Sequence, residues 1–295
     1  MMTIFDVPLP VLSGQLLLGL INGSFYATLS LGLAIIFGLL NVINFAHGAL
    51  YMAGAFVAYL ATTYLGLNYW WGLIVAPLVI GAVGIALERL LISRIADLDH
   101  LYGLLLTFGI ALVIQGVFRN EFGTFGLPYR APPSLGGGWN LGWVFLPTYR
   151  AWVIGISLVV CIGTWLTIER TKLGALLRAS TENRDLVAAF GVNVPLLVTL
   201  TYGFGVALAA FAGVLAAPIY SVNPNMGADL LIVVFAVVVI GGMGSILGAI
   251  VTGFGLGVIE AVTKVYYPEG STTVIFLIMV IVLLLKPSGL FGRSA

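Results

Sequence analysis

The chain has 295 residues, of which 61% are hydrophobic and 8% are charged. Soluble domains carry about 25% charged residues, and a soluble protein with so few charges could not cover its surface with polar groups. The composition therefore excludes an ordinary soluble protein and predicts an integral membrane protein, whose outer surface faces lipid. The net charge of +1 gives no indication of a nucleic-acid partner.

Apolar segments, taken in chain order, predict an all-α, polytopic transmembrane helix bundle of about eight or nine spans, forming one domain over residues 1–295. A spanning helix needs roughly 20 mostly apolar residues. The stretch between Asp6 and Glu88 contains no Asp, Glu, Lys or Arg, so it has room for three helices. The segments Leu230–Ile240 and Thr272–Leu285 are short for a full span, so broken or re-entrant helices are the alternative there. The nine predicted segments are Leu12–Phe37, Gly48–Tyr64, Trp71–Ile92, Leu101–Phe118, Ala151–Ile168, Leu196–Ala216, Leu230–Ile240, Ile246–Val262 and Thr272–Leu285.

The distribution of Lys and Arg predicts the orientation of the chain. One class of loops holds Arg89, Arg94, Arg170, Lys172, Arg178, Arg184, Lys286 and Arg293, and the alternating class holds Arg119, Arg130, Arg150 and Lys264. The positive-inside rule places the first class, and with it the C-terminus, in the cytoplasm. A long polar loop of about residues 119–150 would then lie outside, and one of about residues 169–195 inside.

Several kinds of chemistry have no signature in this sequence. No Lys follows a Gly, so there is no phosphate-binding loop, and neither a zinc-binding His pair nor a Gly-x-Ser-x-Gly elbow is present. We therefore expect no enzyme, cofactor or metal site. Glu88, Asp229 and Glu260 fall near the ends of predicted segments, so the apolar interiors offer no carboxylate relay for ion coupling. Transport against a gradient would then draw its energy from another subunit.

A first polar constellation follows the long N-terminal apolar segment. Asn41, Asn44 and His47 stand together there, and the last two are three residues apart, so on a helix they share a face. Polar groups within a membrane need partners or a water-filled path. Two interpretations stay open. One is a lining of the transport path, which Asn22 and Ser24 would join, and the other is a helix break whose side chains satisfy freed backbone groups.

Part of this constellation has an echo later in the chain. The matching positions are Asn44, Gly48 and Ala49 against Asn223, Gly227 and Ala228. Many transporters contain internal repeats, so the echo is a hint of one.

A second polar constellation lies in the loop of residues 169–195. Its polar members are Arg178, Glu182, Asn183, Arg184 and Asp185. Leu186, Val187 and Phe190 follow at helical spacing, and Gly191 is a typical helix terminator. This pattern predicts a short amphipathic helix, which either lies on the membrane surface or docks a cytoplasmic motor protein.

At these positions the sequence resembles the permease subunits of ATP-driven branched-chain amino acid importers, the LivH-like half. The resemblance runs in order over nearly the whole chain, through Asn22–Ala27, Asn44–Gly48, Phe190–Asn193, Ile240–Ser245 and Lys286–Arg293. Many relatives carry an acidic residue after the His–Gly pair, where this chain has Ala49, so no role of that acid is carried over.

The resemblance implies a multi-pass protein of the bacterial inner membrane. It implies a second, homologous permease subunit, two cytoplasmic ATPase subunits and a periplasmic substrate-binding protein as partners. The helix that contacts the ATPase in such families maps here onto Arg178 through Gly191.

The cargo and the functional class have alternatives. An uncharged path suits a neutral or zwitterionic cargo such as an aliphatic amino acid, because a lone charge at mid-membrane costs about 3 kcal/mol or more. Urea and short amides are alternative cargoes for an importer of this kind. A stand-alone secondary transporter or channel for a small neutral solute would need no ATPase, and a membrane-embedded scaffold would have no conduction path.

Overall fold

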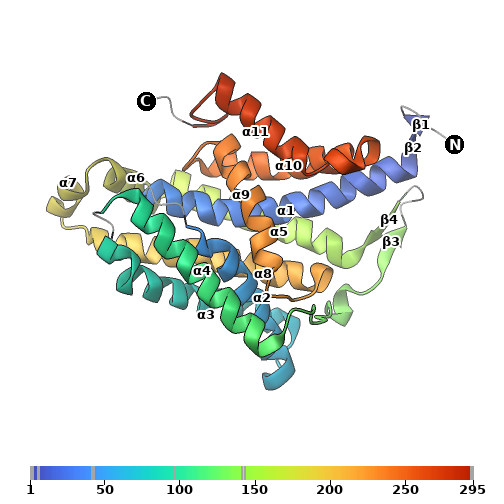
Figure 1. Cartoon of the computed structure of the whole chain (residues 1–295), viewed down its shortest axis with the longest axis horizontal. Coiled ribbons are helices and arrows are strands. Elements are labelled where there is room, and N and C mark those ends of the chain that lie inside the picture. The colour runs from blue at the N-terminus through green and yellow to red at the C-terminus, as the bar shows by residue number, and fades with distance from the viewer. Residues whose placement is uncertain are drawn as a thin grey trace.

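The computed structural model describes residues 3–4, 7–40, 44–95, 98–140, 142 and 144–292. Within these residues the chain is a bundle of helices with two small antiparallel hairpins (Figure 1). The helices are α1 (Leu9–Leu40), α2 (Ala46–Leu65), α3 (Tyr69–Leu90), α4 (His100–Phe122), α5 (Thr148–Arg170), α6 (Lys172–Glu182), α7 (Arg184–Ala189), α8 (Val194–Tyr220), α9 (Met226–Gly241), α10 (Ile246–Tyr266) and α11 (Thr273–Leu285). The short 3-10 helices are η1 (Ile92–Ile95), η2 (Pro133–Leu135) and η3 (Pro268–Gly270). The hairpins pair β1 (Thr3–Ile4) with β2 (Val7–Pro8), and β3 (Gly138–Asn140) with β4 (Phe145–Pro147).

The predicted apolar segments correspond to α1 to α5 and α8 to α11, so the polytopic all-α fold is confirmed. Seven of these helices are long and apolar enough to cross a membrane, judged by length and composition. The other two, α9 and α11, have 16 and 13 residues. They are the same two segments that the sequence marks as short for a full span.

Side-chain caps explain where several helices begin. The Asn68 side chain accepts a hydrogen bond from the backbone N–H of Trp71 and thereby starts α3. Asn193 caps α8 in the same way, and Ser245 caps α10. Such side chains satisfy N–H groups that the first helical turn leaves without a partner. This hydrogen bond matters most where no water molecule can take the place of the side chain.

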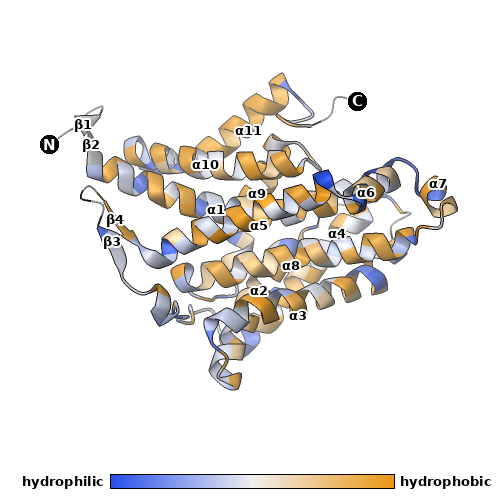
Figure 2. Cartoon of the chain, turned by 180° about the vertical axis from the view of Figure 1, so that it is seen from behind, coloured by the Kyte–Doolittle hydropathy of each residue, from blue (hydrophilic) through white to orange (hydrophobic). Residues whose placement is uncertain are grey.

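The core of the bundle is formed by α1, α2 and α8. In the apolar window of α1, 83% of the residues are buried, whereas only 11% are buried in that of α4. The outer helices therefore expose many large apolar side chains, and Figure 2 colours much of their length as hydrophobic. Such surface suits lipid or a partner subunit.

Two pairs of glycines let the central helices approach closely. α1 crosses α8 where a Cβ at Gly205 would lie 2.8 Å from the carbonyl oxygen of Gly32. The beginnings of α2 and α9 meet where a Cβ at Gly48 would lie 2.5 Å from the carbonyl oxygen of Gly227. In lipid the hydrophobic effect does not drive helices together, and small residues at such contacts allow the close packing that stabilises them instead.

These contacts support an internal repeat, as the sequence echo suggests. Gly48 and Gly227, the matching positions of the echo, touch each other. The helices around them follow the same scheme, because α1 packs on α10 as α8 packs on α3. α1 and α8 run in opposite directions (Figure 1). The segments α1–α4 and α8–α11 are thus arranged as two inverted halves, a common plan in transporters.

The bundle has two distinct ends (Figures 1 and 2). One carries α6 and α7 and is called the α6–α7 end, and the other carries both hairpins and is called the hairpin end. At the α6–α7 end, Arg89 shares a cavity with Asn193, where α8 begins. The turn after Lys286 packs on the end of α9 at the same end, with the N–H of Leu290 2.8 Å from the carbonyl oxygen of Ile240.

The hairpin end carries members of the other class of basic residues. Arg150 and Lys264 share a cavity there, and Arg119 donates to the side chain of Asn225 just before α9. The members of the two charge classes that are placed here therefore lie at opposite ends of the bundle. Arg293 belongs to the first class but lies outside the described residues.

Candidate functional site

The predicted pair Asn44 and His47 lies at the junction of α1, α2 and α8. Asn44 Nδ2 donates to the hydroxyl of Tyr202 on α8 at 2.9 Å, and Asn44 Oδ1 accepts the backbone N–H of Ala46 at 3.0 Å. His47 Nε2 lies 3.0 Å from the carbonyl oxygen of Leu29 on α1. Both side chains are buried. They tie three helices together and satisfy backbone groups where α2 begins.

The other predicted path residues differ in their surroundings. Ser24 is buried and donates to the carbonyl oxygen of Leu20 within α1, at 2.8 Å. Asn41 lies outside the described residues. Asn22 is partly exposed and accepts a hydrogen bond from the Tyr220 hydroxyl of α8. Of the predicted path residues that the structure describes, only Asn22 lines one of the two cavities described next.

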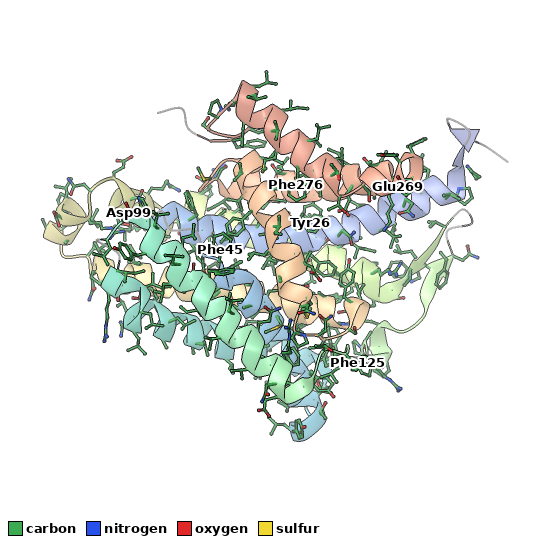
Figure 3. The ribbon with its side chains drawn as sticks, viewed as in Figure 1. Tyr26, Phe45, Asp99, Phe125, Glu269 and Phe276 are labelled. Carbon is green, nitrogen blue, oxygen red and sulfur yellow. The ribbon has the colours of Figure 1, made fainter. Side chains whose placement is uncertain are left out.

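The first cavity, called the hairpin-end cavity, has a volume of about 290 Å³ and lies between α1, α5, α8 and α10. Its lining consists of Gln15, Leu18, Ile21, Asn22, Arg150, Ile219, Tyr220, Glu260, Ala261 and Lys264. Glu260 accepts a hydrogen bond at 2.7 Å from the hydroxyl of Tyr26, which lies in the middle of α1 beside α9 (Figure 3). The cavity thus combines charges of both signs with an apolar wall.

Sequence reasoning missed the charged part of this cavity. Glu260 was expected near a segment end, whereas α10 continues for six residues beyond it, to Tyr266, and Glu260 stands in the cavity wall. The only local signal is that Glu260 and Lys264 are four residues apart and so share a helix face. The contribution of Arg150 from α5 depends on packing between distant segments.

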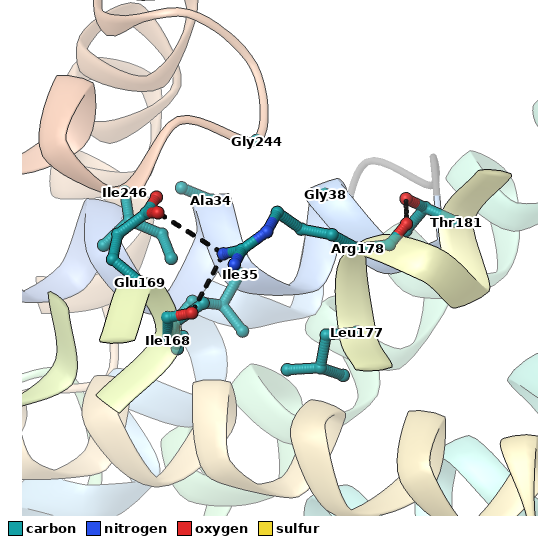
Figure 4. A pocket seen from close by; sticks show the side chains of 10 residues that line it. All are labelled: Ala34, Ile35, Gly38, Ile168, Glu169, Leu177, Arg178, Thr181, Gly244 and Ile246. Atoms are coloured by element: carbon teal, nitrogen blue, oxygen red, sulfur yellow. Dashed lines mark hydrogen bonds and ion pairs between the residues drawn. The ribbon is translucent and has the colours of Figure 1, made fainter. Parts of the chain in front are cut away.

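The second cavity, called the α6–α7-end cavity, lies between α1, α5, α6 and the start of α10, and measures about 90 Å³ (Figure 4). Arg178 of α6 forms an ion pair with Glu169 of α5 at 3.4 Å and donates to the carbonyl oxygen of Ile168 at 2.9 Å. These contacts hold α6 against the end of α5. The predicted residue Arg178 therefore has a structural role at this place.

The α6–α7 segment contains two helices where the sequence pattern pointed to one. α6 ends at Glu182, and α7 begins directly after Asn183. The Asn183 side chain accepts the backbone N–H of Leu186 at 2.9 Å, and this cap starts the second helix. Arg184 and Asp185 form the first turn of α7.

The end of α7 presents apolar side chains to the outside. Gly191 follows it with a φ of 81°, a left-handed conformation that glycine adopts without strain. Leu186 and Phe190 are exposed by 56% and 80%. Exposed apolar residues beside charged ones are typical of a surface that binds a protein or a membrane.

The chain is similar to known transport proteins over nearly its whole length. A family model described as "Branched-chain amino acid transport system / permease component" matches residues 15–284. The high-affinity branched-chain amino acid transport system permease protein LivH of Escherichia coli strain K12 is 30% identical over 295 residues, covering 95% of each chain. The corresponding protein BraD of Pseudomonas aeruginosa is 32% identical over 295 residues, again covering 95% of each chain. LivM of Escherichia coli strain K12, a permease protein of the same kind of system, is 26% identical over 294 residues, covering 91% of this chain and 68% of LivM.

Proposed function

The chain belongs to the family of branched-chain amino acid transport permease components, and we propose that it carries branched-chain or other neutral amino acids into the cell as the membrane-spanning subunit of an ATP-binding-cassette importer. The match over residues 15–284 carries this proposal. Members of this family are transport subunits and not enzymes, in agreement with the expectation from the sequence.

The proposed assembly divides the work between separate chains. Both LivH and LivM are similar to this chain, which supports a pair of homologous permease subunits. Two ATPase subunits would bind at the α6–α7 end, and a substrate-binding protein would bind at the hairpin end. The whole of residues 1–295 acts as one permease domain, with the external loop at about residues 119–150 and the coupling loop at about residues 169–195.

The proposed location is the bacterial inner membrane, with the C-terminus in the cytoplasm. The basic residues of the α6–α7 end support this orientation, because cytoplasmic ends carry an excess of Lys and Arg. The C-terminal turn belongs to the same end, since it is hydrogen-bonded to the end of α9.

The proposed coupling surface consists of Arg178, Glu182, Asn183, Arg184, Asp185 and Gly191. Its exposed apolar neighbours, Leu186 and Phe190, support contact with another protein. ATP-driven closure of the ATPase pair would shift α6 and α7 and switch the bundle between inward-open and outward-open states.

Purification of the tagged chain from native membranes in mild detergent, followed by mass spectrometry, tests the proposal. We expect a second permease and ATPases that contain a phosphate-binding loop. Reproducible isolation of the folded chain alone, with transport activity after reconstitution, would contradict it and favour a stand-alone secondary transporter or channel.

A further inference from the structure

We propose that the hairpin-end cavity is a low-affinity binding site for a free, zwitterionic α-amino acid with an aliphatic side chain. This inference rests on the proposed function and assigns the site at which the permease would receive its cargo.

The charges of the cavity match the two charged groups of an amino acid. Glu260 offers a carboxylate to the ammonium group, and Arg150 and Lys264 offer cations to the carboxylate. Among the described residues, neither cation lies within 4.0 Å ion-pair distance of Glu260. The opposite charges therefore do not neutralise one another directly, and a zwitterion can bridge them.

The remaining wall suits an aliphatic side chain. Leu18 and Ile21 of α1 face Ile219 of α8 and Ala261 of α10 around the same space. Small-molecule sites are mostly apolar with a few placed polar groups, and about 290 Å³ provides room for a molecule of this size.

Hydrogen bonds hold polar groups of the site in place. Tyr26 is a buried residue, only 6% exposed, and its hydroxyl donates to Glu260 and so links α1 to α10. Tyr220 donates to Asn22 and links α8 to α1. A site whose groups are held in advance loses less freedom when a ligand binds.

The site lies at one end of a route along α1, α5 and α10. The same three helices contribute to the α6–α7-end cavity. On α5, Arg150 lines one cavity and Glu169 lines the other, 19 residues further along the helix. At a rise of about 1.5 Å per residue, this distance is roughly 29 Å. This is close to the thickness of a bilayer core, about 30 Å.

Buried apolar side chains separate the two cavities. Ala27, Leu31 and Cys161 are fully buried and pack in one cluster between α1 and α5. The route is closed in this conformation. An amino acid bound at the hairpin end would wait there until α1, α5 and α10 move apart.

Direct binding to the assembled importer tests this proposal. The importer, reconstituted in nanodiscs without ATP and without the binding protein, is titrated with L-leucine, with 4-methylpentanoate, which lacks the ammonium group, and with isopentylamine, which lacks the carboxylate. We expect millimolar binding of leucine that weakens at least tenfold in Glu260→Gln. Binding of 4-methylpentanoate should not weaken in that variant, because this ligand has no ammonium group to lose a partner.

Two further variants test the cation of the site and the specificity of the effect. Lys264→Gln replaces an exposed side chain and should weaken leucine and 4-methylpentanoate alike. Glu269 is an exposed carboxylate after α10 that does not line the cavity. Glu269→Gln should therefore leave leucine binding unchanged. Failure of leucine to bind the wild-type importer, or equal binding by wild type and Glu260→Gln, would overturn the site.

The same preparation separates this site from the proposed function. Co-purified ATPases and their stimulation by the binding protein report on the importer itself, whatever happens to leucine binding. Loss of that stimulation in Glu260→Gln with unchanged leucine binding would mean that the cavity docks the binding protein, and would overturn the ligand site alone.

Discussion

The close contact between α2 and α9 makes Gly48→Ala a sharp test of the central packing. A Cβ at residue 48 would lie 2.5 Å from the carbonyl oxygen of Gly227. Ordinary contact begins near 3.4 Å, so the two helices would have to separate by 3.4 − 2.5 = 0.9 Å. Overpacking of this kind costs about 1–3 kcal/mol, of which about 1 kcal/mol is offset by the higher helix propensity of alanine. We expect a net loss of up to about 2 kcal/mol.

Thermal unfolding of the purified chain in detergent measures this effect. Gly116→Ala is the matched control, because Gly116 lies in α4 and has no neighbouring heavy atom within 4 Å of an added Cβ. The apparent Tm should fall for Gly48→Ala and should stay the same or rise for Gly116→Ala. Equal melting of the two variants would refute the close approach of α2 and α9.

The remaining predictions concern the helix junction and the coupling surface. Tyr202→Phe removes the hydrogen-bond partner of the buried Asn44 Nδ2, so we expect a loss of about 1–3 kcal/mol, measured as a lower Tm. Asn183→Ala removes the cap of α7, a loss of about 1 kcal/mol, and should lower uptake while membrane insertion, followed by fractionation, stays normal. Simultaneous Glu182→Ala and Arg184→Ala should leave ATP hydrolysis intact but uncouple it from transport, and normal uptake by this double variant would contradict the docking role.

The fold could be predicted because its main signal is local. Each apolar segment is recognised from its own residues, so nine helices follow from hydropathy without knowledge of their contacts. The helix α6 was missed because the loop contains many polar residues and its helical pattern is short. The glycine at position 174, which favours a loop in a sequence reading, is buried within α6.

The candidate site could be predicted only in part because its contacts join distant segments. The sequence marks Asn44 and His47 as polar residues in an apolar region. The hydroxyl that binds Asn44, however, comes from Tyr202, which lies 158 residues further along the chain. Tyr26 and Glu260 are 234 residues apart. No periodicity or spacing in one sequence relates such positions, so the sequence indicated which polar residues need partners but not which partners they have.

The link between α6 and α5 suggests how force from another subunit would open the proposed route. Burial of a side chain such as Leu31 contributes about 1.5–3 kcal/mol, so exposing the apolar cluster between the two cavities to water is more than weak binding of cargo can offset. Arg178 fixes α6 to the carbonyl oxygen of Ile168 and to Glu169, and the same helix α5 carries Cys161 in that cluster. A displacement of α6 and α7 by an ATPase would therefore act directly on one wall of the closed segment. The ATPase would therefore drive opening from the α6–α7 end, and the cargo would bind at the hairpin end.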